Sequence, residues 1–175
     1  MRRLLVVLLF PALAAPAAAQ QGAAPAASAV GSVRPVYETV KGFITRAAAQ
    51  VPEADYAFRA TADVRSFGQL VGHVANANYM LCALALGEPS PSRENIEQAR
   101  TTKTALIEAL GASFSYCDRA YQVSDAAALQ PATVFGQNTT RLYALAINAA
   151  HDWEHYGNMV TYMRLKGMVP PSTQP

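Results

Sequence analysis

The chain has 175 residues, of which 51% are hydrophobic, and this length suits one domain with a sizeable core. Its formal net charge is +2; without Arg2 and Arg3, which lie in a segment that we expect to be removed, 12 basic residues face 12 acidic ones. Such a near-neutral chain lacks the basic surface that phosphate contacts need, so the composition disfavours a nucleic-acid-binding protein.

Residues 1–19 have the features of a secretory signal peptide. Arg2 and Arg3 form a basic start, an apolar run follows, and Ala17-Ala18-Ala19 offers the small residues of a cleavage site. The run is shorter than the ~20 apolar residues that span a bilayer. We therefore expect a periplasmic or secreted protein with no stable membrane anchor after cleavage. An uncleaved anchor is the alternative, and the arginine pair leaves twin-arginine export open.

Residues 20–32 are predicted to form a flexible linker, because they are rich in Ala, Gly, Gln, Pro and Ser and carry no charge. From Val33 onward, apolar residues recur at intervals of three and four, which predicts a first helix that ends at Val51-Pro52. Residues 52–65 are predicted to be a polar connection.

A second helix is predicted from Ser66, which suits the N-cap position, to the residue before Gly87. After a turn at residues 88–92, a third helix is predicted on the apolar spacing from Ile96 to Phe114. Residues 118–138 are predicted to be a long loop that closes over the functional site. No segment alternates as a strand does, so no strand is predicted.

The last predicted helix runs from a cap at Thr139 or Thr140 to about Lys166, and Gly167 follows as a stop signal. Four long amphipathic helices in one near-neutral chain predict an all-α fold, a four-helix bundle over residues 33–172. Residues 173–175 form a short tail.

The two cysteines, Cys82 and Cys117, lie near the ends of the second and third predicted helices. If a short turn makes these helices antiparallel neighbours, the cysteines lie at opposite ends of the bundle. They then cannot pair, because the Cα atoms of a disulfide lie within ~7 Å. Parallel helices would allow the bridge. We favour two buried thiols.

The last predicted helix carries a polar stripe at intervals of 3, 4, 3 and 4 residues, formed by Asn148, His151, His155, Asn158 and Tyr162. At ~100° per residue these side chains share one face, which a bundle normally buries. Burying an unpaired imidazole costs about 1–3 kcal/mol, so these rings need partners. Two histidines four residues apart on a helix can hold one metal ion together.

The third histidine of the chain, His73, lies on the apolar face of the second predicted helix. If the two helices pack together, His73, His151 and His155 form a three-nitrogen site that leaves positions open for water or substrate. Zinc, nickel and iron(II) all accept imidazole ligands. The alternative is that the rings are free of metal and bond to neighbouring carbonyl groups.

Further polar side chains flank the three histidines. Asn148, Asn158 and Tyr162 would orient the rings or a bound water. Asp152 stands where a metalloprotease HExxH motif has Glu, so the segment is not that motif. Asp152 and Glu154 lie about 80° to opposite sides of the histidine pair, and either is a candidate general base or a hydrogen-bond acceptor for the ring N–H of a neighbour. Charges at the rim of the site are the alternative.

Two segments resemble the histidine motifs of the DinB/YfiT-like superfamily. The first is Phe67–Ala75, and the second is His151–Asn158 followed by Tyr162, Arg164, Leu165, Gly167, Pro170 and Pro171. The resemblance covers nearly all of residues 33–172. It implies a four-helix bundle that holds a divalent metal, zinc or nickel, through His73, His151 and His155, and it implies that homodimers are common.

The same resemblance implies thiol-dependent transferase or isomerase chemistry with thiols such as bacillithiol or mycothiol, in which the metal holds the thiolate. An exported protein meets an oxidising environment where such thiols are scarce, so hydrolysis by metal-activated water is a comparable expectation. We therefore expect a metal-dependent transferase-like or hydrolase-like enzyme that acts on a small molecule. The alternative is a bundle that binds a metal or small ligand without catalysis.

Overall fold

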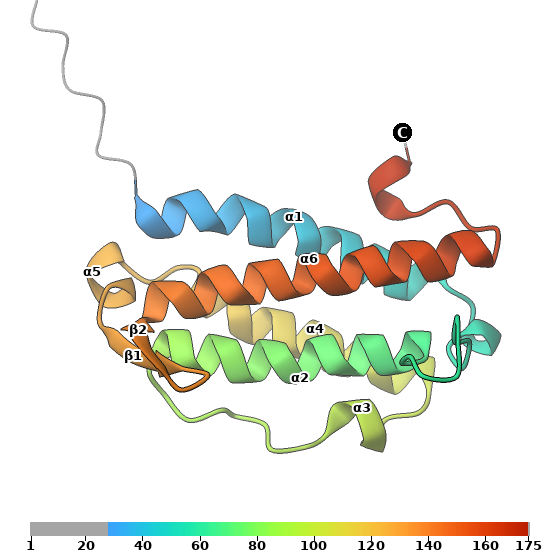
Figure 1. Ribbon diagram of the computed structural model, residues 1–175, viewed down its shortest axis with the longest axis horizontal. Coiled ribbons are helices and arrows are strands. Elements are labelled where there is room, and N and C mark those ends of the chain that lie inside the picture. Colours follow the sequence, from blue (N-terminus) through green and yellow to red (C-terminus); the bar gives the residue numbers. More distant parts are fainter. Residues whose placement is uncertain (1–27, 175) are drawn as a thin grey trace, which may run out of the picture.

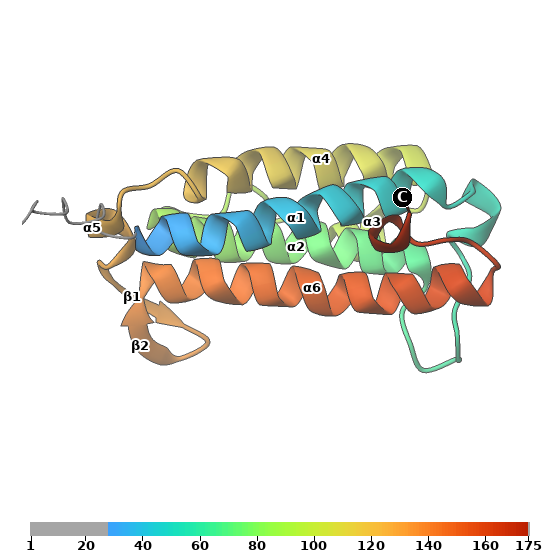
Figure 2. The same cartoon turned by 90° about the horizontal axis from the view of Figure 1, so that it is seen from above.

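Four long helices lie along a common direction in the computed structural model, which describes residues 28–174 (Figures 1 and 2). They are α1 (Ala29–Gln50), α2 (Phe67–Leu86), α4 (Lys103–Ala120) and α6 (Arg141–Leu165). The predicted all-α four-helix bundle is therefore confirmed. The predicted signal peptide and residues 20–27 of the predicted linker lie outside the described residues.

Helix α1 begins earlier than the sequence predicted, so residues 29–32 belong to the helix and not to a linker. The Ser28 side chain accepts a hydrogen bond from the Gly31 N–H, as an N-cap does. The Asp125 carboxylate also accepts bonds from the N–H groups of Ala29 and Val30, at 2.8 and 3.0 Å. A distant acidic residue thus satisfies amides that the start of a helix leaves without partners.

Both ends of α2 agree with the prediction. Ser66 and Gln69 form a capping box, in which each side chain bonds to the backbone N–H of the other residue. Gly87 ends the helix at φ 72°, a left-handed conformation that glycine adopts without the steric cost of a Cβ.

The third predicted helix is in fact two helices, α3 (Ile96–Ala99) and α4. Arg100 is extended, and the side chain of Thr102 caps a new helix by accepting the Ala105 N–H. Between α2 and α4, residues 87–102 return along the whole length of the bundle (Figure 1). Helices α2 and α4 therefore run parallel, and α1 and α6 run the opposite way.

The parallel arrangement corrects the prediction of two free thiols. Cys82 and Cys117 form a disulfide, with their Cα atoms 5.3 Å apart. Each lies near the C-terminal end of its helix, and parallel helices bring these two ends together. The prediction was wrong because it assumed that the chain turned back directly after Gly87.

A short β-hairpin corrects the prediction of a loop without strands. After α5 (Asp125–Ala128), strands β1 (Pro131–Val134) and β2 (Gln137–Thr140) pair antiparallel through a two-residue turn. Both turn residues have positive φ, 49° at Phe135 and 79° at Gly136. Strands of four residues are too short to show clear alternation, and Phe-Gly lacks the Asn or Asp common in such turns.

The remaining elements are two short 3-10 helices, η1 (Glu53–Asp55) in the connection before α2 and η2 (Pro171–Thr173) after α6. Thr140 occupies the N-cap position of α6, as predicted, although its side chain makes no capping hydrogen bond. Among residues 28–174, no helix combines the length and the apolarity needed to cross a membrane.

Candidate metal centre

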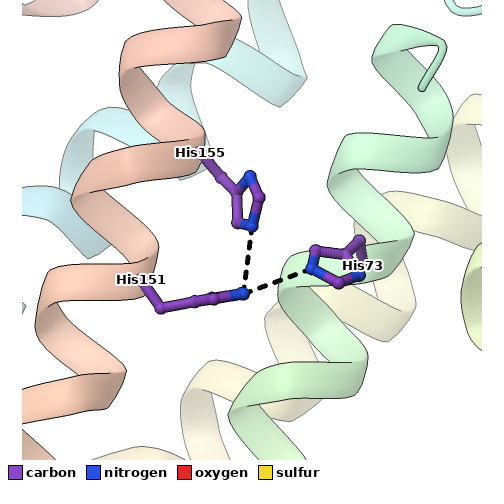
Figure 3. Close-up of side chains that lie close together, drawn as sticks. All are labelled: His73, His151 and His155. Carbon is purple, nitrogen blue, oxygen red and sulfur yellow. Dashed lines mark hydrogen bonds between the residues drawn. The ribbon is translucent and has the colours of Figure 1, made fainter. Parts of the chain in front are cut away.

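The three histidines of the chain meet between α2 and α6 (Figure 3). The Nε2 atom of His151 lies 3.2 Å from Nε2 of His73 and 3.0 Å from Nε2 of His155. Two imidazole nitrogens that each lie ~2.1 Å from one ion are about 3 Å apart, so this spacing fits a shared metal. The structure thus brings together the three residues that the sequence selected as metal ligands.

The protonation states of the rings also fit metal binding. Burial, together with the nearby Arg65 and His151, lowers the pKa of His73, while Glu97 opposes this shift. Burial, followed by the charges of His151, His73 and Arg65, lowers the pKa of His155 to about 3. Both imidazoles are therefore neutral at pH 7, and a neutral imidazole has the free lone pair that a metal requires.

Glu97 is a site residue that the sequence analysis missed. Its Oε2 lies 3.1 Å from Nδ1 of His73, and its Oε1 accepts a hydrogen bond of 2.9 Å from Nε of Arg65. A carboxylate on the outer nitrogen of an imidazole fixes the ring and its tautomer. The one sequence feature that pointed to this contact was Gly72, the residue before His73. Any Cβ at that position would lie 2.7 Å from the Cα of Glu97, so only glycine lets α3 come this close.

Asn76 holds α3 in this place. Its Oδ1 accepts the N–H of Glu97 at 3.2 Å, and its Nδ2 donates to the carbonyl of Glu94 at 2.8 Å. One side chain of α2, a turn beyond His73, therefore binds the backbone of the short helix that carries Glu97.

The three residues predicted to orient the rings have different environments. Asn158 reaches His155, with its Nδ2 3.4 Å from the ring Nδ1. Tyr162 donates its hydroxyl hydrogen to the carbonyl of Arg65 at 2.7 Å, and thereby anchors the loop before α2. Asn148 is fully buried and bonds to Asn78 and Tyr121. Its recorded hydrogen bonds join it to the core and not to the histidines.

The two candidate general bases also differ. Asp152 is fully buried, and burial raises its pKa to about 6. Burial raises the pKa values of Tyr37 and Tyr121, and the nearby charge of Asp152 raises them further. Asp152 is therefore not a charge at the rim of the site. Because its carboxylate is enclosed, it also cannot exchange a proton directly with a substrate. Glu154 is exposed and faces the pocket described next, so its role as general base stays a prediction.

A pocket of about 630 Å³ adjoins the histidines. Its wall includes His155 and Glu97 from the centre, Arg59 and Arg65 from the loop before α2, and Glu154 from α6. No residue of the predicted closing loop, 118–138, lines it, and the hairpin of that segment lies at the other end of the bundle (Figure 1). A volume of this size accommodates a small molecule.

Solved structures share the fold at low sequence identity. A DinB-like protein from Bacillus cereus matches with a TM-score of 0.69 and 12% identity, over 81% of this chain and 95% of that one. A DinB-like protein from Bacillus subtilis matches with a TM-score of 0.60 and 15% identity, over 79% and 93%. A mutant of the mycothiol-dependent maleylpyruvate isomerase matches with a TM-score of 0.63 and 18% identity, over 74% of this chain. The match spans 60% of that isomerase.

Sequence comparison gives the family. No curated protein matches the chain. A profile described as the DinB superfamily matches residues 39–159, a range that holds all three histidines and more than half of the sequence. The chain therefore belongs to the DinB superfamily.

Proposed function

We propose that this protein is an exported, metal-dependent enzyme that binds a divalent ion, zinc or nickel, through His73, His151 and His155. The observation that carries the proposal is the meeting of three Nε2 atoms within 4.8 Å of one another, beside an open pocket. Three protein nitrogens leave coordination positions free, which is the pattern of a catalytic centre. A closed structural site would use four protein ligands.

The bound ion would lower the pKa of a thiol or water ligand and so supply a nucleophile at neutral pH. The chain's own residues would then place the substrate and accept the proton of the thiol or water ligand. The pocket beside His155 admits a small molecule, and Arg65, held by Glu97, adds a positive charge to its wall. Glu154 is an exposed carboxylate on the same wall, and it would take the proton of that thiol or water.

Two reactions remain candidates, each supported by a different observation. The structural likeness to a mycothiol-dependent isomerase supports thiol-dependent group transfer or isomerisation. The disulfide between Cys82 and Cys117 supports an oxidising compartment outside the cytoplasm, where free thiols are scarce and water is the available nucleophile. Homodimerisation stays a prediction from the family resemblance.

The metal proposal is tested by measuring the metal content of protein exported to the periplasm. We expect about one divalent ion per chain, most of which is lost in His151→Ala because two imidazoles hold an ion far less tightly than three. Arg164→Ala, an exposed change on the same helix, is the control and should keep the ion. Equal metal content in wild type and His151→Ala would contradict the site.

Catalysis is tested separately with panels of thiol and ester substrates. An enzyme should show turnover that a chelator abolishes and that Glu154→Gln reduces about 10²-fold or more, because general-base catalysis contributes that much. A protein that holds the ion but turns over no substrate would instead be the non-catalytic metal-binding bundle.

A further inference from the structure

Two neighbouring residues of α6 carry unsatisfied polar atoms. Within residues 28–174, the buried side-chain nitrogen and oxygen atoms that lack a hydrogen-bond partner are Nδ1 of His151 and both carboxylate oxygens of Asp152. Leaving one buried donor or acceptor unpaired costs about 1–3 kcal/mol, and a charged group costs more. The orphaned nitrogen and one orphaned oxygen lie 4.0 Å apart.

The polar groups around Asp152 already have other partners. Tyr121 donates its hydroxyl hydrogen toward the Leu145 carbonyl and the Asn148 side chain. The Tyr37 hydroxyl lies within hydrogen-bond distance of the Phe114 carbonyl and of Asp118. Among these neighbours, His151 is left as the donor for the carboxylate.

The outer ring nitrogens of the other two histidines have the polar partners that Nδ1 of His151 lacks. His73 presents Nε2 to the centre, and its Nδ1 lies 3.1 Å from Oε2 of Glu97. His155 also presents Nε2, and its Nδ1 lies 3.4 Å from the side-chain amide of Asn158. Each of these rings therefore has a polar partner on its outer nitrogen. His151 presents Nε2 in the same way, and Oδ1 of Asp152 lies 4.0 Å from its outer nitrogen.

We propose that Asp152 is a positioning residue that accepts the Nδ1–H of His151 and so keeps the Nε2 lone pair of that ring directed at the shared centre. The 4.0 Å gap exceeds a hydrogen bond by about 1 Å, so the bond requires a small rotation of one or both side chains. The arrangement also places two carboxylates, Glu97 and Asp152, on the outer nitrogens of two ligands.

This role differs from that of a general base. Asp152 has no exposed surface and does not line the pocket, so it acts on a substrate only through His151. It also differs from a purely structural role, because the carboxylate would decide which nitrogen of His151 carries the proton. Replacing Asp152 with leucine, an apolar residue of similar size, should therefore shift the proton of His151 away from Nδ1 and weaken the centre, which loss of a purely structural residue would not do.

The inference rests on the proposed metal centre, and the first experiment separates the two because it needs no metal. We would record the ¹⁵N shifts of the His151 ring in chelator-treated wild type, Asp152→Leu and Asp152→Asn. The share of His151 protonated on Nδ1 should fall in Asp152→Leu, and Asp152→Asn should be intermediate because its carbonyl oxygen still accepts. An unchanged tautomer ratio in Asp152→Leu would overturn the proposal, whether or not the protein binds a metal.

The second experiment measures zinc affinity by calorimetric titration. Loss of an outer carboxylate commonly weakens metal binding about 10–100-fold, and we expect a Kd increase in this range for Asp152→Leu. Asp118→Asn is the control, since that carboxylate pairs with Lys41. It should lower the melting temperature and leave zinc affinity unchanged. Wild-type zinc affinity in Asp152→Leu would also overturn the proposal.

Discussion

At the residue scale, Glu97 joins the pocket wall to the metal centre. It accepts a hydrogen bond from Arg65 on one oxygen and faces Nδ1 of His73 with the other. A side chain with two charged or polar partners has little freedom to rotate, so it holds the imidazole in a fixed orientation. The ring of His73 is thus positioned by a residue 24 positions further along the chain.

We predict that Glu97→Gln raises the Kd for zinc by about 10-fold or more, because a neutral amide is a weaker acceptor for the His73 N–H than a carboxylate. Calorimetric titration measures the effect. Glu94→Gln is the matched control, since Glu94 lies on the same segment but forms its ion pair with Arg100. If both variants bind zinc like wild type, Glu97 does not support the centre.

The three ligands and one outer partner, Asn158 beside His155, were predictable at this scale, but Glu97 was not. Spacing alone placed His151 and His155 on one helix face. The sequence left Asp152 open as an acceptor for a neighbouring ring N–H, but consecutive residues on a helix point about 100° apart, so spacing did not select His151 as its partner. Glu97 was missed because its contact depends on how residues 87–102 return along the bundle.

At the scale of elements, the packing of α3 against α2 decides whether Glu97 reaches the centre. The closest approach is at Gly72, where an added Cβ would lie 2.7 Å from the Cα and 2.9 Å from the N of Glu97. Both atoms belong to the backbone, so the contact cannot be relieved by rotating a side chain. Asn76 fixes the same short helix through two hydrogen bonds to its backbone region.

Gly72→Ala should therefore displace α3. We expect it to lower the free energy of unfolding by about 1–3 kcal/mol, as overpacking does, and to weaken zinc binding along with it. Chemical denaturation and zinc titration measure the two effects.

Gly111→Ala in α4 is the control for helix propensity, because nothing lies within 4 Å of a Cβ at that position. It should raise stability by about 0.5–1 kcal/mol and leave zinc binding unchanged. A Gly72→Ala variant as stable as wild type would show that α3 is free to shift.

At the scale of the whole molecule, the disulfide ties together the two parallel helices. Cys82 and Cys117 are both fully buried and are 35 residues apart in sequence. The bridge closes a loop that contains α3 and most of α4. A link of this kind restricts the unfolded chain, and the folded bundle then loses less entropy on forming.

We predict that the double variant Cys82→Ala with Cys117→Ala lowers the free energy of unfolding by about 2–4 kcal/mol. Urea denaturation measures the loss. Reductant should shift the wild-type midpoint toward that of the variant and leave the variant itself unchanged. Coinciding midpoints for oxidised wild type and the variant would contradict a stabilising role for the bridge.

The sequence by itself determined the helical class, the ends of α2 and the three candidate ligands, because helix periodicity, caps and the four-residue spacing of His151 and His155 are local properties. Tertiary structure decided the parallel course of α2 and α4, and with it the disulfide and the place of Glu97. It also decided that Asp152 is enclosed in the bundle and not at its rim. These features depend on where distant segments pack, and no interval between neighbouring residues encodes the path of the connection that joins them.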